Sequence, residues 1–357
     1  MPFHEQYLSP NDPDYDPLAD LLRVLSLTPA ADVDPASAGA AAQSSHGLPF
    51  DAQDVFLGAS QPTPHGRVFG GQVVAQALVA AGRTVDDLRA GSGAADSGTG
   101  AGTDAGAGTD AGAGTDAGTG VTASPPQRRI HSLHGYFLRA GDAAEPIRFE
   151  VERLRDGASF SARRVHAVQY GKPILSMIFS FQVPADGMDH QVAMPPVPMP
   201  DDIATIAERL AHAPENLAKR WTVRRPIDMR HCEGPLYLRP GPFRTAAQHV
   251  WIRAIGPLPQ DHLTHAAVLA YASDYTVLEA VLRQHGIHWT DPRLRPASLD
   301  HAMWFHRELR ADNWILYAES SPSASGGRGL GIGHMFDVSG RLVATVAQEG
   351  MLRLKEQ

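Results

Sequence analysis

Two kinds of apolar run alternate along this chain and predict two kinds of element. Residues 70–81 are almost continuously apolar and open on two glycines, which predicts a tightly packed helix. Four shorter runs with the composition of β-strands follow: residues 131–137, 147–154, 160–169 and 173–182. Asp156-Gly157 and Tyr170-Gly171 lie between the last three runs and are typical of hairpin turns.

The same order recurs in the last third of the chain. The apolar spacing predicts a helix that begins near Asp274 and runs to Gln284. Four further runs are strand-like: residues 298–306, 314–320, 329–338 and 341–353. Gly171 and Gly340, each in a turn between two such runs, are 169 residues apart (340 − 171 = 169). We therefore predict two related halves, each with one long helix and at least four antiparallel strands, which is an α+β fold.

The runs divide the chain into four parts. They are an N-terminal extension, a first domain, a linker and a second domain, over residues 1–49, 50–182, 183–235 and 236–357. The leucine spacing predicts a helix over residues 16–27 in the extension. A second helix is predicted over residues 201–212 in the linker, with Asp201 or Asp202 as its N-cap.

Residues 88–126, inside the first domain, have an unusual composition. They consist mostly of Gly, Ala, Thr, Asp and Ser, and a Gly-Thr-Asp triplet recurs from Gly102, Gly108 and Gly114. Repeats of six residues can indicate a calcium-binding β-helix. Three copies without a large apolar side chain cannot build a core, so a flexible insertion is the favoured interpretation.

Composition and charge narrow the class of protein. The formal net charge of −8 disfavours nucleic acid or an anionic membrane as the main partner. Cys232 is the single cysteine, so no intrachain disulfide can form and we expect a reducing, cytoplasmic location. Residues 1–6 lack the pattern of a secretory signal, and no apolar run approaches the ~20 residues that span a bilayer.

Three polar residues interrupt apolar segments of the second half. Asp274, Ser298 and Gln348 each lie in a run that is otherwise suited to a protein core. A buried carboxylate, hydroxyl or amide costs free energy unless it is paired. One economical explanation is that the three side chains hold a water between them. A held and activated water indicates hydrolysis.

The histidines give weaker evidence for a functional site than these three polar residues do. His301 and His306 are five residues apart on a predicted strand, so they face opposite sides of it. One of them can line a site, although packing is the favoured role for both. The 17 histidines include no convincing metal-binding set, and no Gly-x-Ser-x-Gly motif indicates a serine hydrolase. We therefore predict neither a metal nor a cofactor.

Four stretches of the chain, taken together and in order, resemble the type II acyl-CoA thioesterases, which are double-hotdog enzymes. They are residues 68–77 (VFGGQVVAQA), 134–142 (HGYFLRAGD), 154–165 (LRDGASFSARRV) and 298–307 (SLDHAMWFHR). The last strand, which ends at residues 348–350, also matches, and the similarity covers roughly residues 50–87 and 128–353. The resemblance implies two hotdog domains, each a central helix wrapped by a curved antiparallel sheet. It also implies hydrolysis of fatty acyl-CoA to a free fatty acid and CoA, and further homo-oligomerisation.

The resemblance also assigns roles to residues. The family's water-orienting Asp, Thr or Ser, and Gln fall on Asp274, Ser298 and Gln348. Ser298 stands where we most readily compare a threonine, so it keeps the hydroxyl but loses the methyl group that stiffens the rotamer. Gly70 and Gly71 are expected to bind substrate, because N–H groups at a helix N-terminus suit a developing oxyanion. His301 is a further candidate for substrate binding.

Two alternative functions are compatible with a hotdog fold. An enoyl-CoA hydratase or dehydratase would pair an acid with a histidine, but the next histidine after Asp274 is His285, eleven residues on (285 − 274 = 11). A non-catalytic acyl-CoA-binding protein would have no reason to bury all three polar residues. Three arginines could contact CoA phosphates or lie on a solvated sheet face, and the second is slightly favoured: Arg163, Arg164 and Arg307.

Overall fold

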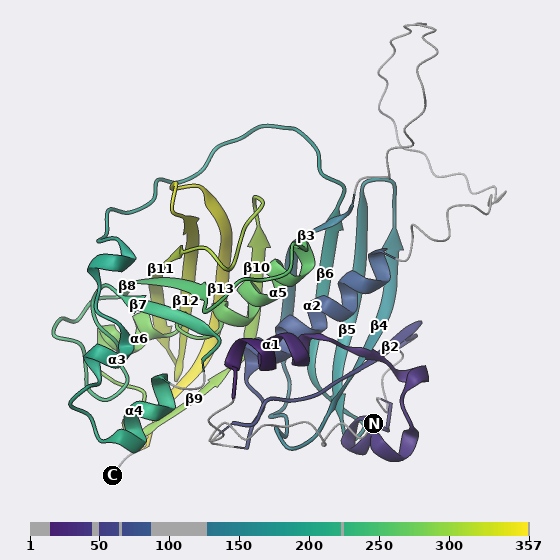
Figure 1. Cartoon of the computed structure of the whole chain (residues 1–357), viewed down its shortest axis with the longest axis horizontal. Helices are drawn as coiled ribbons and strands as arrows, with labels where there is room; N and C mark the ends of the chain where they lie inside the picture. Colours follow the sequence, from purple (N-terminus) through teal and green to yellow (C-terminus); the bar gives the residue numbers. More distant parts are fainter. Residues whose placement is uncertain (1–14, 45–49, 64–65, 87–126, 223–224, 356–357) are drawn as a thin grey trace, which may run out of the picture.

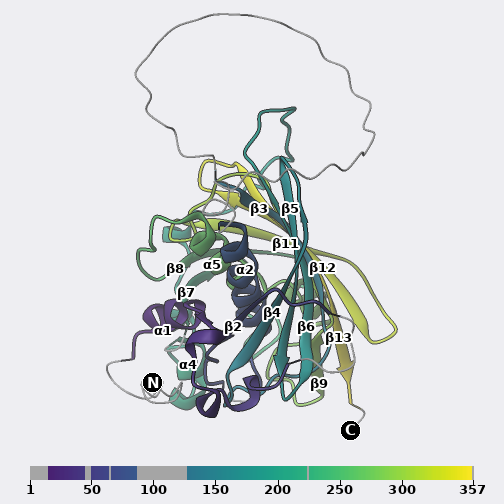
Figure 2. The same cartoon turned by 90° about the vertical axis from the view of Figure 1, so that its right-hand side faces the viewer.

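The computed structural model describes residues 15–44, 50–63, 66–86, 127–222 and 225–355, and the predicted insertion 88–126 lies outside them. A sheet of 13 strands curves around two central helices (Figures 1 and 2). Figure 2 shows α1, α2 and α5 on the same side of the long strands. In this described part no helix is long and apolar enough to cross a membrane.

The first half contains one long helix, α2 (Gly70–Asp86). Its strands are β1 (Thr28–Pro29), β2 (Asp54–Gly58), β3 (Arg129–Phe137), β4 (Ile147–Asp156), β5 (Phe160–Gln169) and β6 (Lys172–Gln182). The four longer strands match the four predicted runs. Gly171 has a φ of 66°, a conformation that favours glycine, in the hairpin between β5 and β6.

The second half repeats this plan with a broken helix, α5 (His262–Ser273) followed by α6 (Glu279–His285). Its strands are β7 (Ile227–His231), β8 (Ala247–Ala254), β9 (Leu294–Ser298), β10 (Asp300–Phe305), β11 (Ile315–Ser325), β12 (Arg328–Asp337) and β13 (Leu342–Leu354). β7 lies within residues 183–235, the segment predicted as a linker, and pairs with β8.

The strand order shows that the halves are related by a pseudo-two-fold axis. The order is β1-β2-β4-β5-β6-β3-β10-β13-β12-β11-β8-β7, so strands of matching position in each half lie at equal distances from the centre. β3 and β10 meet there in antiparallel register, with Leu133 opposite Met303. Adding 169 to Phe160, the start of β5, gives 329, one residue after β12 starts at Arg328. The predicted α+β fold with duplicated halves is confirmed.

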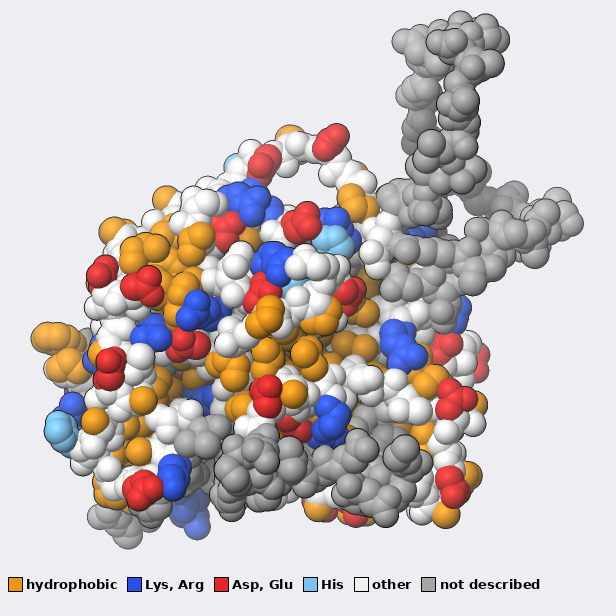
Figure 3. Space-filling model, viewed as in Figure 1, with side chains coloured by type: hydrophobic (Ala, Val, Ile, Leu, Met, Phe, Trp, Pro, Cys, Tyr) orange, Lys and Arg blue, Asp and Glu red, His pale blue; other side chains and the backbone are white. Residues whose placement is uncertain are grey.

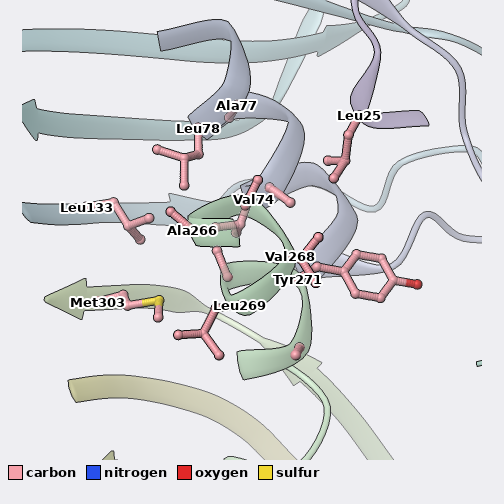
Figure 4. Close-up of a cluster of buried hydrophobic side chains, with 14 of the residues drawn as sticks. Leu25, Val74, Ala77, Leu78, Leu133, Ala266, Val268, Leu269, Tyr271 and Met303 are labelled. Atoms are coloured by element: carbon pink, nitrogen blue, oxygen red, sulfur yellow. The ribbon is translucent and has the colours of Figure 1, made fainter. Parts of the chain in front are cut away.

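The core forms where α2 packs against α5 above the central strands. Small side chains such as Ala77 and Ala266 let the two helices approach closely, and the larger Leu78 and Leu269 fill the space towards the sheet (Figure 4). Leu133 and Met303 are fully buried beneath them.

The predicted helix over residues 16–27 is confirmed as α1 (Pro17–Leu25), capped by Asp16. It docks on α2 because the Gln76 amide donates to the Val24 carbonyl at 2.8 Å, and because Leu21 and Val24 are fully buried. This contact ties the N-terminal extension to the central helix.

The predicted helix from Asp274 to Gln284 is wrong at its start and in its continuity, whereas its end lies within one residue of the end of α6 at His285. α5 starts twelve residues earlier (274 − 262 = 12), after Asp261 caps the N–H groups of Leu263 and Thr264. It ends at Asp274, which is its C-cap, and α6 begins only at Glu279. Residues 265–273 of α5 are all buried, so this stretch has no single apolar face from which spacing alone could place the helix start.

The helix predicted over residues 201–212 is much shorter in the structure. α3 (Ile206–Arg209) is capped by Thr205, whose hydroxyl accepts from the Glu208 N–H while the Glu208 carboxylate accepts from the Thr205 N–H. The expected caps lie upstream in the 3₁₀ turn Pro200–Asp202. Thr205 and Glu208 form a complete capping box, and this local advantage sets the helix start. α4 (Glu215–Thr222) follows.

Candidate active site

Asp274, Ser298 and Gln348 meet at one point of the second half. The Gln348 Nε2 donates to Asp274 Oδ1 at 2.8 Å and to Ser298 Oγ at 3.0 Å. The Ser298 hydroxyl donates to the same Asp274 oxygen at 3.3 Å. The three polar groups therefore form a closed triangle of hydrogen bonds around one carboxylate oxygen. Gln348 is buried, whereas Asp274 and Ser298 keep part of their surface exposed.

Three different elements supply this triangle. Asp274 caps the C-terminus of α5, Ser298 ends β9 and Gln348 lies in β13. β9 pairs with β13 with Ser298 opposite Gly350, two residues from Gln348. Residues two apart on a strand face the same side, so this register brings the hydroxyl and the amide together.

His301 fixes the orientation of the Gln348 amide. It is 0% exposed, and its Nδ1 lies at hydrogen-bond distance from Gln348 Oε1. A carbonyl oxygen only accepts, so Nδ1 carries the proton and the amide nitrogen is turned towards Asp274. The other ring nitrogen contacts Ser273 Oγ at 2.9 Å. His301 thus lies behind Gln348 and orients its amide.

The start of α2 completes the site from the first half. The Gly71 N–H donates to Asp274 Oδ2 at 2.8 Å, so the carboxylate stabilises the N-terminus of a helix in the other half. A Cβ on Gly70 would lie 2.6 Å from Asp274 Oδ2, and one on Gly71 would lie 2.4 Å from the Tyr271 carbonyl oxygen. Only glycine lets the two helices approach this closely.

Gly71→Ala is expected to lower the free energy of unfolding by about 1–3 kcal/mol, because the added Cβ meets a backbone atom of α5 that cannot rotate away. The same displacement withdraws the Gly71 N–H from Asp274. Chemical denaturation measures the first effect. Gly187→Ala, where a Cβ meets nothing within 4 Å, is the matched control. Equal stability of the two variants would contradict the close helix contact.

Burial dominates the electrostatics of the acid. Desolvation raises the pKa of Asp274 above its ordinary value, and this is the largest cause of the shift. His301, the Gln348 amide, the Gly71 N–H and the Ser298 hydroxyl each lower it by stabilising the charged form. The raised pKa makes the carboxylate a stronger base than a free aspartate, while its partners keep it in one orientation.

Aromatic residues surround the acid. Phe69 stacks on Tyr275 with ring centroids 4.8 Å apart and meets Tyr271 edge-on at 5.1 Å. The Tyr275 hydroxyl donates to that of Tyr271, which donates to Gln61 Oε1 at 2.9 Å. The Gln61 amide then donates to the buried Asp20 carboxylate of α1. This chain of hydrogen bonds connects the extension to the site.

The remaining candidates lie elsewhere. His306 is exposed and bonds Thr345, on the opposite side of the strand from His301 as predicted. Arg163 is fully buried against Asp156 and Thr84, so the prediction of a solvated sheet face is wrong for it. Sequence reasoning missed two residues of the site. Ser273 contacts His301, and Phe137 lies beside Gly70. Their only sequence signal is adjacency to other motif residues. In the described segments no cluster of three or more His, Cys, Asp or Glu residues could hold a metal ion.

Comparison with known proteins identifies relatives that span both halves of the chain. A family model described as acyl-CoA thioesterase matches residues 229–351, and one described as the acyl-CoA thioesterase N-terminal domain matches residues 59–182. Acyl-coenzyme A thioesterase 8 of Homo sapiens is 37% identical over 325 residues, which are 87% of each chain. The crystal structure of acyl-CoA thioesterase II TesB2 from Mycobacterium marinum is 35% identical, covers 94% of this chain and 98% of its own, and has a TM-score of 0.62. A hot dog fold protein from Alicyclobacillus acidocaldarius, 16% identical with a TM-score of 0.63, agrees in fold, so the predicted double hotdog is confirmed.

Proposed function

Because the chain belongs to the acyl-CoA thioesterase family and is therefore an enzyme that hydrolyses acyl-CoA thioesters, we propose that Asp274, Ser298 and Gln348 hold the attacking water. The observation that carries this proposal is the closed triangle of hydrogen bonds around Asp274 Oδ1. Paired polar groups of this kind, partly buried and partly open, can position one water beside a bound substrate.

The chemistry needs no covalent intermediate. A thioester carbonyl is already electrophilic, so a water oriented by Ser298 and Gln348 attacks its carbon while Asp274 accepts the proton. The C–S bond then breaks, the CoA sulfur leaves with its electron pair and takes up a proton, and the acid is released. Gly70 carries no side chain, so the start of α2 packs directly against Asp274 Oδ2. The Gly71 N–H already donates to Asp274, so it stabilises the base more directly than an oxyanion.

A hydratase mechanism has less support. It requires a histidine free to exchange a proton near Asp274, and His301, which touches Gln348, is the candidate among the described residues. Both nitrogens of that ring are bonded, one to Gln348 and the other to Ser273. The ring is also 0% exposed, so it has no access to substrate.

The substrate is a fatty acyl-CoA in this proposal, because Phe69 and Phe137 offer apolar surface next to Gly70 for an acyl chain. We also propose a cytoplasmic homo-oligomer. Tyr136 and Ile178, on β3 and β6, are 62% and 47% exposed on central strands, and such apolar surface is typical of an interface. Light scattering would give the mass in solution.

The experiment that tests the proposed function is thiol release from a series of acyl-CoAs, short to long, by the wild type and Asp274→Asn side by side. Hydrolysis by the wild type that collapses in the variant supports both the reaction and the base. Wild-type hydrolysis that the variant retains would reject the base and leave the reaction. If the folded wild type released no thiol from any member, the series would be repeated with an enoyl-CoA.

The pH dependence of kcat/KM provides a second test. Asp274 accepts a proton only when ionised, so activity falls as the pH drops through its pKa. Since burial raises this pKa, the acid limb is expected above about 3.9, the ordinary value for aspartate. Ser298→Ala removes a hydrogen bond that lowers the pKa, so the limb should move to higher pH. A limb that does not move in this variant would contradict the assignment.

A further inference from the structure

A cavity of about 260 Å³ lies away from the proposed catalytic triangle, between the end of α2, the start of α5 and the central strands. Gly82, His262 and Ala266 line it from the two helices, and Arg129 and Phe305 line it from β3 and β10. Figure 3 shows Lys, Arg and His side chains together with Asp and Glu side chains on this face, below the segment that arches over the molecule after β6.

The pseudo-two-fold axis relates this cavity to the catalytic triangle. The turn glycines Gly171 and Gly340 are 169 residues apart, and the starts of the matching strands β3 to β6 and β10 to β13 differ by 168 to 171. With the offset of 169, Ser298 corresponds to Arg129 (298 − 169 = 129) and Gln348 to Phe179 (348 − 169 = 179). For the helices the offset is 192 (262 − 70), so Asp274 corresponds to Gly82 (274 − 192 = 82). A Cβ on Gly82 would lie 2.5 Å from Leu263, just as one on Gly70 would meet Asp274. The cavity is the counterpart of the catalytic site in the other half.

None of the three hydrolytic groups has an equivalent in the counterpart. Glycine replaces the acid, arginine the hydroxyl and phenylalanine the amide. This site can hold a molecule but has no base at the position of Asp274 to activate water.

The charge of the cavity is positive. Arg128, Arg129 and Arg307 line it against one carboxylate, Glu308, which gives a lining charge of +2 with histidines neutral (3 − 1 = 2). Burial lowers the pKa of His131 and His306, so the arginines carry this charge at neutral pH. Arg129 also pairs with Glu308 at 3.3 Å, Arg307 pairs with Asp189, and Arg128 donates to neutral oxygens.

Arg129 has an unused donor. Its Nε is buried and has no hydrogen-bond partner within the described residues. A buried donor of this kind is costly unless something accepts from it, and an anion at the cavity is the chemical match.

Eight apolar side chains also line the cavity, beside two glutamines and three histidines. The apolar ones are Ile130, Phe181, Pro184, Ala185, Leu263, Ala266, Phe305 and Leu309. Arginines beside an apolar floor suit a molecule that has a hydrocarbon chain and an anionic head.

We infer that this cavity is a second, non-hydrolytic site, which binds an anionic amphiphile with its chain on the apolar floor and its head at Arg129. The inference rests on the proposed function in one respect: it takes the ligand from the reaction's own compounds. A released fatty acid and an intact acyl-CoA share the required chemistry.

The test is titration calorimetry of the full chain with dodecanoate. Arg129→Glu is expected to weaken one class of binding site at least about tenfold, because the head meets a repulsive charge. Ala185→Trp, on an exposed residue at the cavity mouth, should weaken the same class by filling it. Arg328→Glu, which breaks a similarly exposed pair with Glu349, is the matched control and should bind as the wild type does. Equal affinity in all four proteins would overturn the inference.

Two further titrations identify the source of the ligand. Dodecanoyl-CoA is added to Asp274→Asn with and without Arg129→Glu. Tighter Arg129-dependent binding of dodecanoyl-CoA than of dodecanoate assigns the site to acyl-CoA, and the reverse assigns it to the fatty acid. If CoA without an acyl chain bound as tightly as both acyl compounds, the site would not require a hydrocarbon chain and the assignment of an amphiphilic ligand would be wrong.

Thiol release by Arg129→Glu should stay within about twofold of the wild type at saturating substrate, because this residue lies outside the catalytic triangle. Failure here is thus distinct from failure of the proposed function, which the Asp274→Asn assay reports.

Discussion

Asp274→Asn is expected to lower kcat for acyl-CoA hydrolysis by at least about 100-fold. Asparagine has the same shape and can still accept from the Gly71 N–H, so α2 keeps its place. It cannot take a proton from water. If its oxygen faces Gly71, its amide nitrogen faces the Gln348 Nε2, and two donors then oppose each other where one carboxylate oxygen accepted before. Steady-state thiol release at saturating substrate measures the loss.

The stability of this variant separates catalysis from folding. Burial raises the pKa of Asp274, so the native state binds this proton more tightly than the unfolded chain does. The stability that this group contributes is fully present below the unfolded pKa and is lost as the pH rises through the higher native pKa, so the ionised side chain opposes folding at neutral pH. Asp274→Asn should unfold at the same or a higher denaturant concentration than the wild type. Asp54→Asn is the control. It breaks a partly buried ion pair between Asp54 of β2 and Arg153 of β4 and should keep full kcat. Full activity in Asp274→Asn would reject it as the base.

Gln348→Ala is expected to lower kcat by a similar factor, at least about 100-fold, for a different reason. The Gln348 amide makes two of the three hydrogen bonds of the triangle and receives the His301 Nδ1–H on its other side. Without it, Asp274 and Ser298 lose the donor that holds them together, and the water loses its fixed position. Asp274 itself remains, so kcat/KM should still decrease at low pH as this carboxylate is protonated, while its maximum value is lower than in the wild type.

A buried amide also contributes to the stability of the fold, so the measurement needs a control variant that removes a similarly buried amide away from the site. Gln169 is buried in the first half, where its amide bonds backbone groups at Asp142 and Glu145. Gln169→Ala should cost a similar ~1–3 kcal/mol of stability and leave kcat unchanged. If both alanine variants lowered kcat equally, the effect of Gln348→Ala would be structural and its catalytic role would be lost.

The sequence determined the long strands, because they are local features. The strands β4, β5 and β6 end where Asp156-Gly157 and Tyr170-Gly171 allow a turn, and apolar composition marks their interiors. The duplication was also readable, since a repeat offset of 169 needs no knowledge of contacts. The identity of Asp274, Ser298 and Gln348 as candidates followed from the cost of burying polar groups in apolar segments and from the family resemblance.

Only the tertiary structure decided what each of these residues touches. Helix α5 ends after Ser273, where it packs against α2 and Asp274 accepts a hydrogen bond from the Gly71 N–H of the other half. This contact joins residues far apart in the sequence, so the local apolar pattern could not reveal where the helix ends. The place of His301 behind Gln348 follows from the pairing of β10 with β13, which are far apart in sequence. The second cavity exists because two halves with the same fold carry different side chains at equivalent positions. Local sequence specifies elements through short-range sterics and burial, whereas a site depends on long-range register between elements.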